Sequence, residues 1–100
     1  MLYGEAVAYA FVQAMIKAGK NPTRADLVSA INGGLPQGPA VAPYAYSASN
    51  HSGITGAYIG VIKKGALVKQ GPVYVTDTTP TGAVTAFTGS QQAAPATGMP

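Results

Sequence analysis

The sequence contains no cysteine and no tryptophan, and it has one histidine and only three acidic residues among 100. Without cysteine, the chain forms no disulfide and holds no metal through thiolates. The acids Glu5, Asp26 and Asp77 are far apart in the sequence, so no pair is placed for general acid–base chemistry. His51 has no acidic residue nearby and no catalytic motif around it. We therefore predict that the chain is not an enzyme and uses neither a cofactor nor a metal.

Charge is also scarce. Charged residues make up 9% of the chain, whereas a typical soluble domain has about 25%. This shortage suggests that part of the surface is made to contact other protein. The formal net charge is +3, but Lys63 and Lys64 are the only adjacent basic residues. The sequence therefore predicts no nucleic-acid interface.

No membrane-spanning or secretory segment is visible. Met1 is not followed by the basic residues that begin a secretory signal. The uncharged stretch between Glu5 and Lys17 has 11 residues, whereas a membrane-spanning helix needs about 20. We interpret this stretch as part of a packed helix.

The first third of the chain predicts two helices. A helical repeat covers residues 4–18, and Gly19 is its natural C-terminal cap. The more polar face of this helix recurs every four residues: Glu5, Tyr9, Gln13 and Lys17. An apolar stripe lies beside it: Ala8, Phe11, Val12, Met15 and Ile16. A second helix is predicted over residues 24–31, with Thr23 as its N-cap and Asp26 completing a capping box.

The rest of the chain predicts strands and loops, which makes the fold class α+β. Residues 35–43 and 47–52 are predicted loops, and residues 57–62 and 66–68 form a predicted hairpin. Residues 71–72, a Gly-Pro pair, are expected to interrupt the chain before a further strand at residues 73–75.

Residues 77–100 are rich in threonine, alanine, glycine and proline, and we predict a low-complexity C-terminal tail after a domain at residues 1–76. Val84 and Phe87 are the side chains expected to anchor part of this tail.

Tyr44 and Tyr46 are the candidate ligand-binding residues. Alternate residues of an extended segment point the same way, so their rings are expected to share a face. Aromatic rings with hydroxyl groups suit the wall of an amino-acid pocket. The alternative is ordinary packing, with the ring buried and the hydroxyl group at the surface.

Two stretches, in this order, carry a family resemblance. The first is Tyr3-Gly4-Glu5-Ala6, then Lys17-Ala18-Gly19-Lys20, then Thr23-Arg24-Ala25-Asp26-Leu27. The second is Tyr46-Ser47-Ala48-Ser49-Asn50-His51-Ser52-Gly53, then Ala57-Tyr58-Ile59-Gly60-Val61-Ile62-Lys63-Lys64-Gly65. Together they resemble the C-terminal part of the leucine/isoleucine/valine-binding protein family, which are type I periplasmic binding proteins of ABC importers. The resemblance covers about residues 3–76, with Glu5 and Asn50 at positions where the family commonly has aspartate.

The resemblance implies a fold, a function and a location. Family members are several times longer and have two α/β lobes that close on the ligand like a hinged trap. It implies an extracytoplasmic protein that captures a branched-chain or related amino acid and delivers it to a membrane permease, with its signal sequence upstream of this segment. The family's anchors for the ligand come mostly from segments absent here. His51 and Gly53 match the family signature, and we interpret them as loop-forming residues.

Two other functions stay open: a self-sufficient small structural or interaction domain with no small-molecule ligand, and a small-molecule-sensing regulatory domain on the same fold.

As a segment of a larger protein, the chain is also expected to expose apolar side chains. The expected set is Phe11, Val12, Met15, Ile16, Leu27 and Ile31. Because leaving such side chains in water is costly, we predict a homo-oligomer of the isolated segment that associates through the first helix.

Overall fold

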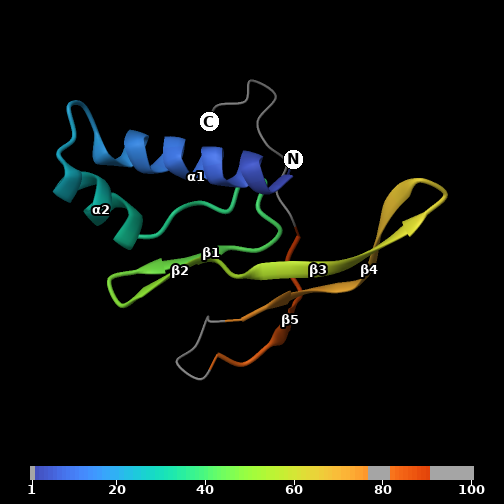
Figure 1. Cartoon of the computed structure of the whole chain (residues 1–100). Helices are drawn as coiled ribbons and strands as arrows, with labels where there is room; N and C mark the ends of the chain where they lie inside the picture. Colours follow the sequence, from blue (N-terminus) through green and yellow to red (C-terminus); the bar gives the residue numbers. More distant parts are fainter. Residues whose placement is uncertain (1, 77–81, 91–100) are drawn as a thin grey trace.

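A computed structural model describes residues 2–76 and 82–90 of the chain. Two helices lie on one side of a layer of strands (Figure 1). The helices are α1 (Leu2–Ala18) and α2 (Arg24–Asn32), and the strands are β1 (Tyr44–Ser47), β2 (Asn50–Ile54), β3 (Gly56–Lys63), β4 (Ala66–Val75) and β5 (Thr85–Phe87). This α+β arrangement, with a small antiparallel sheet around the predicted hairpin, confirms the coarse fold class.

The ends of the helices form as their sequence signals predict. Gly19 adopts a φ of +88°, and its N–H donates to the carbonyls of Met15 and Ile16, which closes α1. At the start of α2, the Thr23 hydroxyl accepts from the N–H of Asp26, and the Asp26 carboxylate accepts from the N–H of Thr23 at 2.9 Å. The Thr23 hydroxyl also donates to this carboxylate at 2.7 Å, and together with the Thr23 N–H it favours the charged form and lowers the pKa of Asp26.

The orientation of α1 differs from the prediction. Its inward face is a stripe of small residues, with Ala6 and Ala14 buried and Ala10 half-buried between them. Two residues predicted on the polar, outward face turn toward the body instead. The Tyr9 ring lies directly over Gly38, and the Nε2 atom of Gln13 is buried. The prediction was wrong because alanines spaced four apart let the helix approach the loop closely, whereas larger side chains would hold it away.

Much of the predicted apolar stripe is exposed. Phe11 and Ile16 are 58% and 59% exposed, and Met15 is 36% exposed. Val12 is half-buried, as are Leu27 and Ile31 of α2. The outer face of α1 is therefore apolar, as expected for a segment of a larger protein, although not every member of the predicted set lies on it.

The predicted loop at residues 47–52 is instead a tight hairpin. Strands β1 and β2 pair through Ser47 and Asn50, which leaves Ala48 and Ser49 as the turn. The Ser47 hydroxyl accepts from the N–H groups of Ser49 and Asn50, at 3.3 and 3.1 Å. Polar side chains that look like a loop in the sequence thus satisfy the backbone of a turn.

A second sheet has the order β3-β4-β5, with all neighbours antiparallel. The turn between β3 and β4 is Lys64-Gly65, and both residues have positive φ (50° and 78°), as in a type I′ hairpin. The expected interruption at Gly71 and Pro72 is wrong, since both residues lie inside a continuous β4. They form a bulge there, because the register shifts between Ala57 and Ile59 and Gly71 takes a φ of +75°.

Strand β5 lies beyond residue 76 and pairs with the end of β4 through Phe87 and Val73. The half-buried Phe87 thus anchors this part of the predicted tail, whereas Val84 is exposed. The rest of the predicted tail, residues 77–81 and 91–100, lies outside the described residues.

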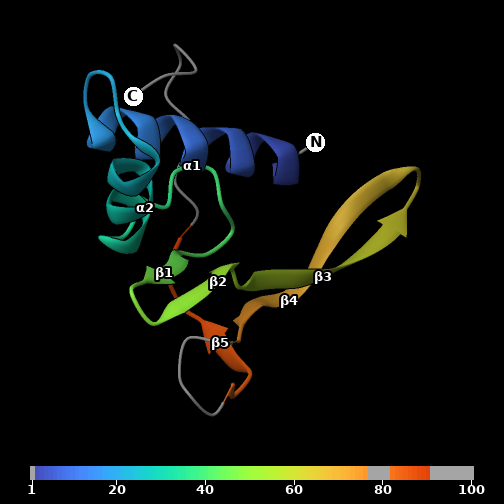
Figure 2. The ribbon, with the colours of Figure 1, turned by 60° about the vertical axis from the view of Figure 1, so that its left-hand side comes forward.

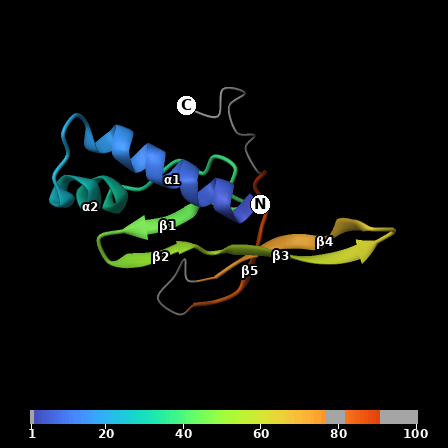
Figure 3. The ribbon, with the colours of Figure 1, turned by 45° about the horizontal axis from the view of Figure 1, so that its top comes forward.

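The core of the described residues is built from small side chains. Its buried apolar members are Ala6, Ala14, Ala30, Ala40, Ala42, Tyr44 and Val73. Alanine removes little apolar area from water, so such a core gives modest stabilisation. Away from this core, the distal half of the β3–β4 hairpin extends past the helices in every view (Figures 2 and 3), and each residue from 59 to 72 is exposed.

Candidate functional site

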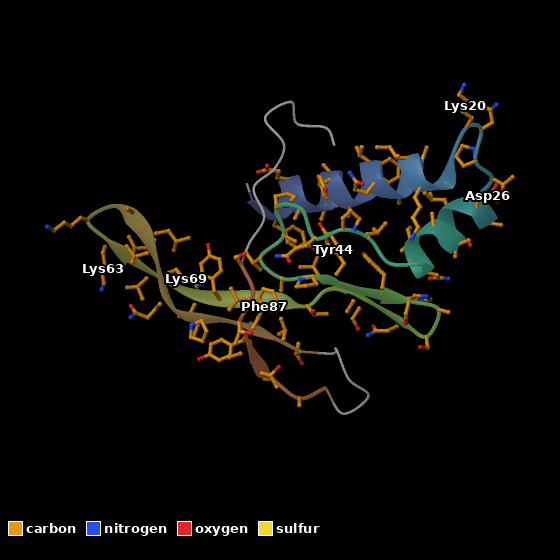
Figure 4. The ribbon with its side chains drawn as sticks, turned by 180° about the vertical axis from the view of Figure 1, so that it is seen from behind. Lys20, Asp26, Tyr44, Lys63, Lys69 and Phe87 are labelled. Carbon is orange, nitrogen blue, oxygen red and sulfur yellow. The ribbon has the colours of Figure 1, made fainter. Side chains whose placement is uncertain are left out.

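Strand β1 places the two predicted site tyrosines next to each other. The ring centroids of Tyr44 and Tyr46 are 6.1 Å apart with an interplanar angle of 28°, so the rings share a face as predicted. Tyr44 lies between the helices and the strands at the centre of the molecule (Figure 4). The two rings therefore form a single aromatic wall, which connects the core to the surface.

The Tyr44 hydroxyl group is used for packing. It donates to the carbonyl of Ala6 at 2.6 Å, which ties β1 to the inward face of α1. Burial raises the pKa of Tyr44, and the neighbouring Tyr46 and Tyr9 raise it further. The hydroxyl group therefore stays protonated and remains a donor at neutral pH. In the described structure, Tyr44 positions the wall and does not offer its hydroxyl group to a ligand.

Tyr46 lies over the backbone of β2. A β-carbon built on Gly53 would come within 2.6 Å of the Tyr46 hydroxyl oxygen. Gly53 also has a φ of +70°, which follows from the register shift between Ala45 and Tyr46. Glycine is needed here both for its conformation and for the space it leaves. Glycine at position 53 thus has a structural cause.

A groove of about 380 Å³ opens beside this wall, between the two sheets. It is lined by Pro43, Tyr44, Ala45, Tyr46, Ser47, Asn50, Val75 and Phe87. Its volume falls within the range of about 300–1,000 Å³ that is usual for small-molecule sites. The groove offers aromatic faces, the hydroxyl groups of Tyr46 and Ser47 and the Asn50 amide, but its lining contains no charged side chain.

The polar side chains of Ser47 and Asn50 in this groove are engaged with its own backbone. The Ser47 hydroxyl is engaged by the backbone of its own turn, and Asn50 Oδ1 accepts from the N–H of Ser52 at 2.9 Å. Aromatic rings beside such groups suit a small amphipathic solute. The ammonium and carboxylate groups of a free amino acid would need charged partners from outside this groove.

A smaller cavity of about 190 Å³ lies on the other side of the tyrosines, under α1. Its lining combines α1, α2 and β2 and is apolar apart from the tyrosine hydroxyl groups: Val7, Ala10, Phe11, Ala14, Ile31, Leu35, Tyr44, Tyr46 and Ile54. This volume is below the usual range for a ligand site, so we interpret the cavity as imperfect packing around small core residues.

His51 does not join a metal or catalytic site in the described structure. It is exposed on β2, and its Nε2 lies 3.2 Å from Asn32 Oδ1 at the end of α2. Across residues 2–76 and 82–90, no group of three or more His, Cys, Asp or Glu side chains is close enough to hold a metal ion. Among the same residues, no helix is long and apolar enough to cross a membrane.

Of the groove's lining, only Tyr44 and Tyr46 were foreseen from the sequence. Asn50 belonged to a predicted loop, while Val75 and Phe87 come from strands far along the chain. Only the pairing of β4 with β5 brings Val75 and Phe87 to the tyrosine wall, and a single sequence carries no signal for that pairing.

In comparisons with known proteins, no protein family, curated protein or solved structure matches this chain.

Proposed function

We propose that this chain is the C-terminal segment of an extracytoplasmic solute-binding protein with two α/β lobes. That protein captures a branched-chain or related amino acid for an ABC importer and has no catalytic activity. We assign this class of protein because the two motifs within residues 3–76 resemble, in the same order, those of the leucine/isoleucine/valine-binding protein family. The observation that carries the proposal further is that α1 is apolar on two sides.

The inward side of α1 packs its alanines against the loop and β1, while Ile16 is exposed, and Val7 and Phe11, which border the cavity under α1, are also exposed. An apolar helix face left exposed is typical of a surface made to contact further protein. In the proposed protein, these outer side chains pack against the remainder of the lobe. The proposal thus accounts both for the exposed stripe and for the low fraction of charged residues.

The groove beside Tyr46 provides one part of the ligand's surroundings in this proposal. Its uncharged aromatic lining fits the apolar side chain of leucine, isoleucine or valine. Charged groups that hold the ammonium and carboxylate come from the other lobe. The 100-residue chain alone is therefore expected to bind no amino acid with measurable affinity.

Calorimetry on two proteins tests the proposal: the 100-residue chain and the protein encoded by its entire native reading frame. Titration with leucine, isoleucine and valine is expected to give saturable binding for the longer protein only. In that protein, Tyr46→Ala should weaken binding about tenfold. Tyr74→Ala is the control, because Tyr74 is an exposed tyrosine on β4 that does not line the groove.

Micromolar binding by the 100-residue chain would contradict the two-lobed clamp. A reading frame that encodes only these residues, or a longer protein that binds none of the three amino acids, would overturn the proposal. Either result would favour the alternative of a self-sufficient interaction domain, which the paired strands and capped helices also permit.

A further inference from the structure

The outer edge of β3 lacks a neighbouring strand. Within the described residues β3 pairs only with β4, on one side, and the β1–β2 sheet is separate. The strand has eight residues, Gly56–Lys63, with neither a proline nor a charged side chain before its last position. Tyr58, Ile59, Val61 and Ile62 give it high β-propensity. An exposed edge of this kind presents unpaired N–H and C=O groups and recruits another strand.

The opposite edge of the same hairpin is protected. Strand β5 covers β4 from Val73 to Val75. The part of β4 that β5 leaves open carries Lys69, the bulge at Gly71, and Pro72, which has no N–H to donate. Lysine, proline and bulges are the devices by which natural sheets block edge pairing. Strand addition at this hairpin is therefore directed to β3.

The pairing within the hairpin decides which β3 groups face outward. With a two-residue turn, Lys63 and Ala66 form the hydrogen-bonded pair next to it. Hydrogen-bonded and non-hydrogen-bonded pairs alternate along an antiparallel ladder. The N–H and C=O groups of Gly60 and Ile62 therefore point away from β4, and Tyr58, opposite the bulge, continues this outward set.

We propose that β3 pairs with β3 of a second copy of this chain, antiparallel and about a two-fold axis at Gly60. In this register Gly60 faces Gly60 of the second copy, and Tyr58 faces its Ile62, so that the outward backbone groups meet. Ile59 lies opposite Val61, a pairing of β-branched side chains that stabilises sheets. The hairpins join into one sheet with the order β4-β3-β3-β4.

The charges on the hairpin favour this register. Lys63, Lys64 and Lys69 account for the whole net charge of +3, because the remaining three basic and three acidic residues cancel. Lys63 and Lys69 both lie on the projecting arm (Figure 4). The two-fold axis at Gly60 places Lys63 opposite Ala57 of the second copy, and so keeps the tips with Lys63 and Lys64 at opposite ends. Lys69, which pairs with Gly60, lies on the outer strand β4 of each copy. Pairing nearer the tip would bring like charges together, which is unfavourable.

This inference goes beyond the proposed function and does not depend on it, since it rests only on the edge, the bulge and the charges of the hairpin. The test compares two proline variants of the 100-residue chain by sedimentation or light scattering. Ile62→Pro removes an outward N–H from the open edge of β3. Leu67→Pro is the matched control, because Leu67 is directly opposite Ile62, is also exposed and apolar, and lies on the blocked edge.

The wild-type chain and Leu67→Pro are expected to be dimers at about 100 µM, which requires a dissociation constant of the dimer below that concentration. Ile62→Pro is expected to be a monomer with an unchanged far-ultraviolet circular dichroism spectrum. A monomeric wild type, or two proline variants with the same oligomeric state, would overturn the inference. So would dissociation of the dimer by Phe11→Asp but not by Ile62→Pro, which would place the contact at α1.

Charge substitutions at Ala57 test the register. Ala57→Glu places a carboxylate opposite Lys63 of the second copy and should tighten the dimer about two- to fivefold, whereas Ala57→Lys should loosen it by a similar factor. Residues 57 and 63 of one chain are about 20 Å apart along the strand, so pairing within the chain does not account for the effect. Equal dissociation constants for the two variants would rule out this register.

Discussion

Tyr44 is the residue that ties β1 to α1 most directly, through its contact with Ala6. The hydroxyl group of a buried side chain donates to a helix carbonyl at 2.6 Å. Burial raises the pKa of Tyr44 above the ordinary value of about 10. The hydroxyl group thus stabilises the fold in its neutral form.

The substitution Tyr44→Phe should lower the free energy of unfolding by about 1 kcal/mol at neutral pH. The difference from wild type should shrink as the pH rises above about 10, because the unfolded tyrosine then loses its proton while the folded one retains it. Its contribution to stability is complete below the ordinary pKa and is lost on the alkaline side. Urea unfolding of both proteins at pH 8 and pH 10.5 measures this difference. The same difference at both pH values would show that Tyr44 does not ionise differently in the two states.

Single residues also mark where the sequence was informative. The spacing of Tyr44 and Tyr46 correctly predicted that the rings share a face, because strand geometry alone decides it. The hydrogen bond from Tyr44 to Ala6 was not predictable, since it joins residues 38 positions apart. Gly53 was identified only as part of a loop, and its need for positive φ follows from a register shift that a single sequence does not reveal.

At the scale of elements, α1 is the instructive case. Its position and its C-terminal end at Gly19 followed from the sequence, because they depend on local capping and periodicity, whereas the helix begins at Leu2, two residues before the predicted start. Which face turns inward depends on what the helix packs against. Large apolar side chains and small alanines both define plausible inward faces, and here the close approach of the loop at Gly38 favours the alanines.

The two faces of α1 predict opposite results for two similar substitutions. Tyr9→Asp should destabilise the chain by about 1–3 kcal/mol, because it places a charge where the Tyr9 ring covers Gly38. Phe11→Asp should change the free energy of unfolding by less than about 0.5 kcal/mol, because Phe11 is exposed. Thermal unfolding of the two variants at equal, dilute concentration measures both effects. Greater destabilisation by Phe11→Asp would mean that the apolar stripe is the inward face after all.

The strand elements show a similar division. A short turn between residues 62 and 66 was predicted because it separates two runs of strand-forming residues, and the structure narrows this turn to Lys64 and Gly65. The β1–β2 turn was missed because serine and asparagine are equally common in open loops. Gly71 and Pro72 were expected to end a strand, whereas a bulge accommodates both without ending it.

At the scale of the whole molecule, the chain divides into a packed part and a projecting arm. The packed part contains the helices, β1, β2 and the base of β3 and β4, and the arm is the exposed segment at residues 59–72. Apart from the hydrogen bonds between β3 and β4, few contacts hold the arm in place. Local opening is easiest where buried contacts are few.

Hydrogen exchange should reveal this division. In dilute solution, the N–H groups of Val61 and Val68, which pair across the arm, should exchange faster than those of Ala10 and Ala14 in α1. Exchange measured residue by residue with NMR spectroscopy tests this order. Equal protection of both regions would indicate that arm and body open together. Repeating the measurement at higher concentration provides a control, because pairing through β3 should slow exchange at Gly60 and Ile62.

Tyr44 and Ala6 are 38 residues apart in the sequence, and this separation affects when α1 can dock during synthesis. The hairpins close through two-residue turns and need only about 1–10 µs. A ribosome that adds about 5–20 residues per second makes Ala6 about 2–8 s before it reaches Tyr44. During this interval α1 has no β1 on which to bury its alanines, so its inward face stays open. Within this segment, α1 is thus made before the strand on which it docks, and its alanine face needs protection until β1 follows.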